Sequence, residues 1–159
     1  MHTLILAALL AQAQPASTEV KLADGAGKPV GTAKLTQTAH GVLIAVELHD
    51  MKPGSHAIHL HETGKCEGPA FKSAGGHFNP AKKQHGFMTA EGPHAGDLPN
   101  IEVGPEGHAR AEFIAADATM DALQDADGSA LVIHAKQDDY KSQPAGDAGD
   151  RVACGVISK

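Results

Sequence analysis

The chain has 159 residues, and its 13 basic and 19 acidic residues give a net charge of −6 without a Lys- or Arg-rich run. This length suits a single domain, and the charge excludes the basic surface that nucleic-acid binding requires. Aromatic residues are only 3% of the chain and Trp is absent, so the core must be built mainly from Val, Ile, Leu and Ala.

The first segment is an apolar stretch over residues 4–10, followed by Ala11-Gln12-Ala13. The stretch is too short to span a bilayer, and the small-x-small triplet is typical of a secretory cleavage site. We therefore predict a signal peptide over 1–13, a mature domain over 14–159 without stable membrane insertion, and a periplasmic or secreted location. The alternative is a short buried N-terminal helix, since no Lys or Arg precedes the apolar stretch.

Short apolar segments separated by Gly- and Pro-rich turns follow along the rest of the chain. The clearest is 40–50, where the even positions from Val42 to Leu48 are all apolar, a period of two that indicates a strand. About eight strands are expected, near 20–22, 30–35, 40–50, 56–61, 99–103, 108–115, 130–135 and 152–157, and 117–124 suits a helical turn or two. This pattern predicts an all-β fold, an antiparallel sandwich or barrel.

Two stretches do not fit strands, residues 62–98 and 137–150, which are rich in Gly, Pro and charged residues. Loops of this length inside a compact domain are usually functional or disordered. The first contains several His residues, and seven of the eleven His of the chain fall between His49 and His94. We therefore expect function in these loops.

His59 and His61 are two residues apart on an expected strand, so both imidazoles project from the same side. Alone, such a pair is more often two exposed polar positions. The first loop adds three imidazoles and a carboxylate, a donor set that suits tetrahedral zinc, from His77, His85, His94 and Asp97.

His134 lies in the apolar run 131–134, where a lone His is more often a core residue than a ligand. Counted together, these six His and one Asp are one ligand short of two four-coordinate sites, unless one imidazole serves both metals. An all-imidazole site with an open position suits copper, whereas the three-His, one-Asp set suits zinc.

The chain has two cysteines, Cys66 and Cys154. In an oxidising compartment such a pair indicates a disulfide, whereas in the cytosol it indicates two thiols or a metal site.

Five sequence runs, in this order, resemble the Cu/Zn superoxide dismutases over nearly the whole mature chain: HLHETGKC (59–66), SAGGHFNP (73–80), HAGDLPNI (94–101), VIHAKQDDY (132–140) and GDAGDRVACGVI (146–157). The resemblance implies an eight-stranded Greek-key barrel with two functional loops, and an enzyme that converts superoxide to oxygen and hydrogen peroxide with copper and zinc. It implies copper ligands at His59, His61, His77 and His134, and zinc ligands at His77, His85, His94 and Asp97, with His77 as the bridge.

The resemblance also implies three supporting roles. Asp138 links a copper histidine, His59, to a zinc histidine, His85; its alternative is a solvated loop acid. Cys66 and Cys154 form the disulfide. Arg151 is implied as the catalytic arginine that binds the anion beside copper, and its alternative is an ordinary surface residue.

Two non-enzymatic interpretations compete, a metal-delivery domain of the same fold and a histidine-rich metal buffer. The first typically lacks a copper ligand or the active-site arginine, all of which are present here, and the second does not explain Arg151. Asp150 adds negative charge beside Arg151, so its removal is expected to raise the low-salt rate. The sequence leaves both a monomer and a homodimer open. It assigns no role to several histidines, namely His2, His40, His49, His56 and His108.

Overall fold

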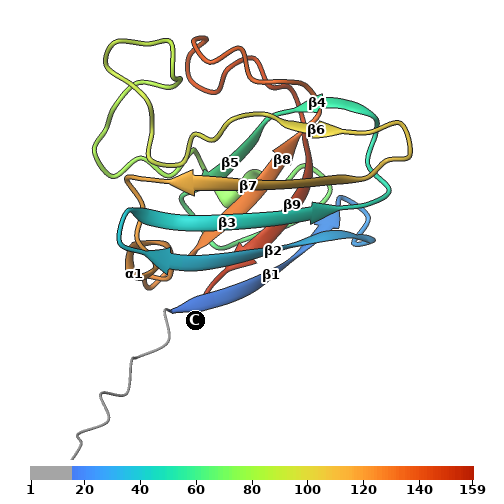
Figure 1. The fold of residues 1–159 in the computed structure, drawn as a ribbon, viewed down its shortest axis with the longest axis horizontal. Helices are drawn as coiled ribbons and strands as arrows, with labels where there is room; N and C mark the ends of the chain where they lie inside the picture. The colour runs from blue at the N-terminus through green and yellow to red at the C-terminus, as the bar shows by residue number, and fades with distance from the viewer. Residues whose placement is uncertain (1–15) are drawn as a thin grey trace, which may run out of the picture.

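The structure, a computed structural model, describes residues 16–159, so the predicted signal peptide lies outside the described residues. Nine strands make up most of the regular structure in this range (Figure 1): β1 Ser17–Asp24, β2 Pro29–Thr38, β3 Gly41–Leu48, β4 Gly54–His56, β5 Ile58–His61, β6 Ile101–Val103, β7 Ala109–Ala115, β8 Ser129–His134 and β9 Arg151–Ile157. A 3-10 turn, η1 (Lys72–Ala74), and a short helix, α1 (Met120–Leu123), complete the elements. No helix within residues 16–159 is long and apolar enough to cross a bilayer.

The strands form a curled antiparallel structure. Seven of them pair in the order β5-β8-β9-β1-β2-β3-β7, and β4 pairs with β6. Because β6 also runs beside β7 (Figure 1), the two sheets enclose one core. The predicted all-β antiparallel fold is confirmed.

The structure has one strand more than the sequence pattern indicates, because the segment predicted as a single strand at 56–61 changes partners at Ala57. The Ala57 N–H donates to Lys136 O at 2.8 Å, and the His134 N–H donates to Ala57 O at 2.9 Å. Before this point β4 pairs with β6, and after it β5 pairs with β8. This segment therefore joins the two sheets and places His59 and His61 in the seven-stranded sheet.

The core is aliphatic, as the composition predicts. The four alternating residues of β3, Val42, Ile44, Val46 and Leu48, are at most 3% exposed, and β3 lies between β2 and β7. A smaller cluster, consisting of Phe71, Ala74, Ala130, Val132 and Cys154, packs the first long loop against β8 and β9.

The two long loops lie over the same end of the barrel (Figure 1). Hydrogen bonds connect them. Just after the first loop, the Asn100 side chain donates to Asp138 O at 3.0 Å and accepts from the Asp138 N–H at 2.8 Å. Gln143 forms a similar pair of hydrogen bonds with the backbone of His85, both at 2.9 Å. These contacts hold the predicted ligands of the first loop, and Asp138 of the second, near the ends of β5 and β8.

Candidate metal centre

Strand β5 organises the centre because it lies at the edge of its sheet and pairs with the loop on its open side. Phe78 N–H donates to Leu60 O at 2.8 Å, Leu60 N–H donates to Gly96 O at 2.9 Å, and Gly96 N–H donates to Phe78 O at 2.9 Å. These bonds set two isolated bridges, which pair His59 with Asp97 and His61 with His77. Two loop ligands are thus positioned by backbone pairing with β5.

Four imidazoles converge beside β5 and the end of β8. Their ligand atoms all lie within 4.8 Å of one another, and the residues are His59, His61, His77 and His134. All four are at most 7% exposed. Each has one buried ring nitrogen without a hydrogen-bond partner in the described structure: His59 Nδ1, His61 Nε2, His77 Nε2 and His134 Nε2. Buried polar atoms almost always have a partner, so four orphaned nitrogens in one place fit a metal ion.

The opposite nitrogen of each ring has a partner that determines the tautomer. His61 Nδ1 lies 3.1 Å from Gly75 O, and His134 Nδ1 lies 3.3 Å from Gly149 O. Carbonyl oxygens only accept, so these Nδ1 atoms carry the protons and the Nε2 lone pairs point inward. His59 has the reverse arrangement, because its Nε2 donates to Asp138 at 2.8 Å. Each ring is therefore oriented to offer its orphaned nitrogen to an ion.

A second group adjoins the first and shares His77; it consists of His77, His85, His94 and Asp97. The three Nδ1 atoms lie 2.8, 3.0 and 3.3 Å from Asp97 Oδ1. Asp97 Oδ2 is held by the N–H groups of Gly86 and His94 at 2.8 and 3.0 Å. Three nitrogens and one carboxylate oxygen form the donor set that zinc takes in tetrahedral sites.

Burial and hydrogen bonding set the charges of the metal-free centre. Burial is the main cause that lowers the pKa of His59 to about 4, against its hydrogen bond to Asp138, and that of His134 to about 3, where the neighbouring His59 adds to the effect. Burial also acts to lower the pKa of His85, but hydrogen bonds to Asp138 and Asp97 raise it to about 9. Burial acts to raise the pKa of Asp97, but hydrogen bonds from His77 and His85 hold it well below its usual value. His59 and His134 therefore favour the neutral imidazole, which is the form that binds metal.

Asp138 lies between the two groups and contacts both. Its Oδ2 accepts from His59 Nε2 at 2.8 Å, and its Oδ1 accepts from His85 Nε2 at 3.0 Å. The residue is 2% exposed, which contradicts the alternative of a solvated loop acid. These hydrogen bonds from His59 and His85 hold the pKa of Asp138 below its usual value despite burial.

Arg151 begins β9 and reaches across to the first loop. Its guanidinium donates to Phe71 O at 2.7 Å and to Gly75 O at 2.6 Å. Gly75 O also lies next to His61 Nδ1, so the guanidinium sits beside one of the four converging imidazoles. Arg151 lines a pocket of about 550 Å³ together with Pro69, Ala70, Lys72, Gly149 and Asp150. A small anion entering this pocket meets a planar cationic donor next to the histidines.

The predicted disulfide is confirmed, since Cys66 and Cys154 are joined with their Cα atoms 5.7 Å apart. It ties the first loop to β9. This loop carries the Phe71 and Gly75 carbonyls that accept from Arg151, so the covalent link also helps to hold the Arg151 guanidinium in place.

Three contacts in the centre were not predicted from the sequence. Glu62 accepts the Gly76 N–H at 2.8 Å and so fixes the backbone just before His77. His56 is 3% exposed, and its ring nitrogens lie 2.6 Å from His134 O and 2.8 Å from Lys52 O. Gly146 packs against Asp138. Of these three residues, only His56 could have been noticed in the sequence, because it lies three residues before the His-x-His pair.

The fold and these two groups are those of a β-barrel metalloprotein, with two adjacent candidate ligand sets that share one histidine. The family described as copper/zinc superoxide dismutase matches residues 30–157. The chain belongs to this family, and the resemblance seen in the sequence motifs is confirmed. It is accordingly an oxidoreductase that dismutates superoxide, with copper and zinc as cofactors.

Individual relatives agree with this assignment. Superoxide dismutase Cu-Zn 1 of Aquifex aeolicus is 47% identical over 151 residues, which cover 91% of this chain and 89% of that protein. A solved SOD-like protein from Bacillus subtilis is 40% identical with a TM-score of 0.84, covering 87% of this chain and 97% of that one. Cu/Zn superoxide dismutase from Brucella abortus is 29% identical with a TM-score of 0.77, covering 89% and 99%.

Proposed function

We propose that the two ligand sets divide the metals of this superoxide dismutase. Copper is held by the four converging imidazoles, His59, His61, His77 and His134. Zinc is held by the mixed set, His77, His85, His94 and Asp97. His77 contributes one ring nitrogen to each set, and Asp138 orients one ligand of each.

The observation that carries the proposal is the set of four buried ring nitrogens without a protein partner. An all-nitrogen set suits a redox-active copper ion, and the set that includes a carboxylate suits zinc. His77 fits the bridging position because its Nδ1 lies 2.8 Å from Asp97 while its Nε2 is one of the four orphaned atoms.

When bound, copper supplies the one-electron steps by which two superoxide anions and two protons become one oxygen and one hydrogen peroxide. The protein binds and orients the anion through Arg151, whose guanidinium is fixed by two carbonyls at the pocket. His77 Nε2 is the protein atom that we assign to carry a proton, because the other ring nitrogen is anchored to Asp97.

The same proposal includes an extracytoplasmic location, periplasmic or secreted. The disulfide supports it, because such bonds persist in oxidising compartments. Both a monomer and a homodimer are compatible with the activity, since all the proposed ligands come from one chain.

The test is an assay of superoxide dismutation on the copper- and zinc-loaded protein, with metal content measured on the same sample. His134→Ala should lose copper and turnover while keeping zinc, because His134 belongs only to the first set. His40→Ala, at an exposed position, is the matched control and should keep both. One copper and one zinc bound to the wild type without turnover would indicate metal handling instead.

A further inference from the structure

Two histidines outside the metal centre lie together where β3 ends and β7 begins. His49 directly follows β3, and His108 directly precedes β7. The register pairs Leu48 with Ala109, so the next opposed pair along the ladder is His49 with His108. Directly opposed residues of antiparallel strands have Cβ atoms about 4.5–5.5 Å apart. Two imidazoles at this separation can bind one ion.

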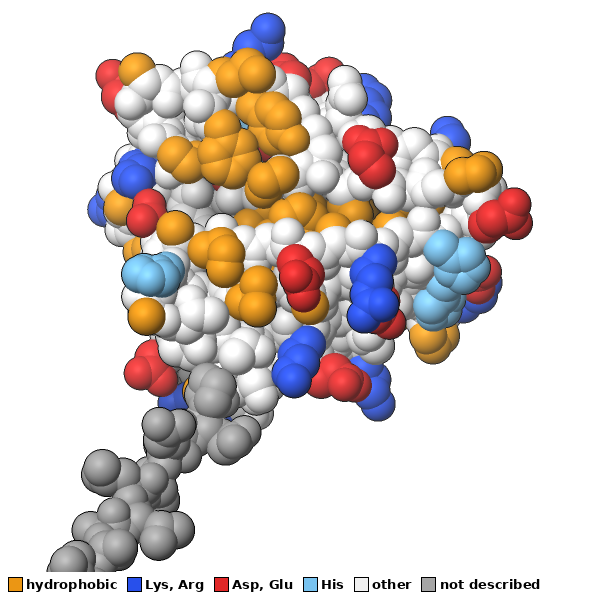
Figure 2. Space-filling model, viewed as in Figure 1, with side chains coloured by type: hydrophobic (Ala, Val, Ile, Leu, Met, Phe, Trp, Pro, Cys, Tyr) orange, Lys and Arg blue, Asp and Glu red, His pale blue; other side chains and the backbone are white. Residues whose placement is uncertain are grey.

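Both imidazoles are accessible and share one face of the sheet. Glu47 and Arg110, two residues away on each strand, form an exposed ion pair at 3.0 Å. Because side chains alternate between faces, His49 shares the face of Glu47, and His108 shares that of Arg110. His49 is 45% exposed in its side chain, and His108 is exposed. Figure 2 shows histidine side chains gathered on this side of the molecule.

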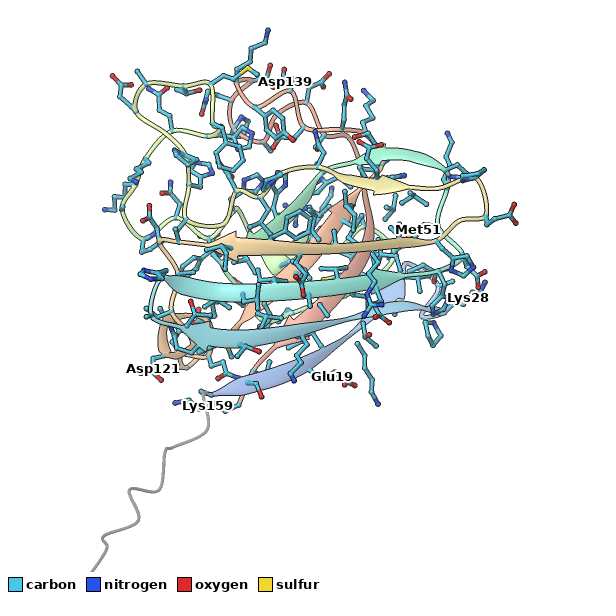
Figure 3. The ribbon with its side chains drawn as sticks, in the orientation of Figure 1. Glu19, Lys28, Met51, Asp121, Asp139 and Lys159 are labelled. Atoms are coloured by element: carbon cyan, nitrogen blue, oxygen red, sulfur yellow. A yellow bond between two sulfur atoms is a disulfide. The ribbon has the colours of Figure 1, made fainter. Side chains whose placement is uncertain are left out.

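Asp50 adds a carboxylate to this pair. Its Oδ2 lies 3.5 Å from His49 Nδ1 and 2.8 Å from Lys28 Nζ. The turn before His108 packs against Asp50, because a Cβ on Gly107 would lie 3.7 Å from the Asp50 Cα. Figure 3 places Lys28 and Met51 at this same end of the barrel. Both contacts of the carboxylate use Oδ2, so Oδ1 can bind an ion while Lys28 stays paired.

We propose that His49, His108 and Asp50 form a peripheral binding site for a divalent transition-metal ion such as Zn²⁺. Two imidazole nitrogens and one carboxylate oxygen are a set that zinc takes with water in the fourth position. The ladder holds the two strands in register up to Leu48 and Ala109, so that rotation of the exposed His49, His108 and Asp50 side chains brings their ligand atoms onto one ion. The site is exposed and has three protein ligands, and it therefore binds more weakly than the buried centre.

Isothermal titration of Zn²⁺ into the copper- and zinc-loaded protein tests this proposal. The wild type should bind one further equivalent, and His49→Ala and His108→Ala should each lose it. His40→Ala removes an exposed histidine elsewhere and should retain it. Asp50→Asn should weaken it. Superoxide dismutation should be unchanged in all four variants, which shows that each is folded and metal-loaded.

Three outcomes contradict the proposal. The first is a wild type that binds no further equivalent, and the second is a further equivalent that survives both histidine substitutions. The third is an equivalent that is lost in His40→Ala as well, which would indicate nonspecific binding by surface histidines. None of these outcomes bears on the buried copper and zinc sites, because the protein is loaded before the titration.

Discussion

Replacing Gly146 by Ala tests how far Asp138 determines metal binding. Gly146 has a φ of +69°, and a Cβ built there overlaps Asp138 Oδ1 and lies 2.7 Å from His85 Nε2. The carboxylate must therefore move, and it then loses its hydrogen bonds to His59 at 2.8 Å and His85 at 3.0 Å. Neither histidine is substituted, so the change acts through the orientation of His59 and His85, and on His85 also by direct contact with the new methyl group.

Loss of such an orienting partner typically costs about 10- to 100-fold in metal affinity, or about 1.4–2.7 kcal/mol. The backbone strain of Ala at positive φ adds about 1–2 kcal/mol to folding, which a control must match. Gly27→Ala is that control, because Gly27 has a φ of +84° and no atom within 4 Å of a built Cβ. Zinc and copper affinities are measured by competition with chelators of known affinity, and thermal unfolding is measured on the metal-free forms.

We expect both variants to show a similar loss of stability, and only Gly146→Ala to lose metal affinity. Equal metal affinities in Gly146→Ala and Gly27→Ala would refute the reasoning, because they would mean that the Asp138 bridge does not support the ligands. A crystal structure of Gly146→Ala with Asp138 unmoved would refute it at an earlier step.

Three further results are expected. Asp150→Asn should raise kcat/KM at low salt by about twofold, since one charge ~10 Å from the anion is worth ~0.4 kcal/mol in water, and an unchanged or lower rate in stopped-flow assays contradicts this steering effect. Reduction of the disulfide, whose cysteines are 88 residues apart, should cost at most about 4–5 kcal/mol of stability; an unchanged denaturation midpoint counts against it. The metal-free protein should be most stable near pH 6.5–7. Below pH ~6.5 the free energy of unfolding falls, because the unfolded chain takes up protons at His59 and His134 while their folded-state pKa values are only about 4 and about 3. Towards pH 9 the contribution of His85 is lost, because the pKa of this residue in the folded state is about 9. A free energy of unfolding that only rises or only falls from pH 4 to pH 9 in denaturant titrations would contradict these signs.

The sequence by itself predicted the fold class, which is confirmed, and the residues that we propose as metal ligands. The period-two pattern of β3 reflects a strand with one buried face, and this pattern is local in the chain. The His-x-His pair on β5 likewise needs only strand geometry to place both rings on one side. The sequence motifs, in their order, then indicated the family.

Other features depend on contacts between distant residues, and only the tertiary structure decided them. Ala57 divides one predicted strand into two because its backbone bonds to residues 134 and 136, beyond any local pattern. The buried state of Asp138 depends on hydrogen bonds from His59 and His85, 79 and 53 residues away.

The tautomers of the histidines that we propose as copper ligands illustrate the same limit. His61 and His134 present Nε2 because carbonyls at Gly75 and Gly149 accept from Nδ1, whereas His59 presents Nδ1 because Asp138 accepts from Nε2. A residue type specifies which atoms can bind a metal. Which of its two nitrogens does so depends on the neighbours that folding supplies, because each ring has one proton and the partner chooses its position.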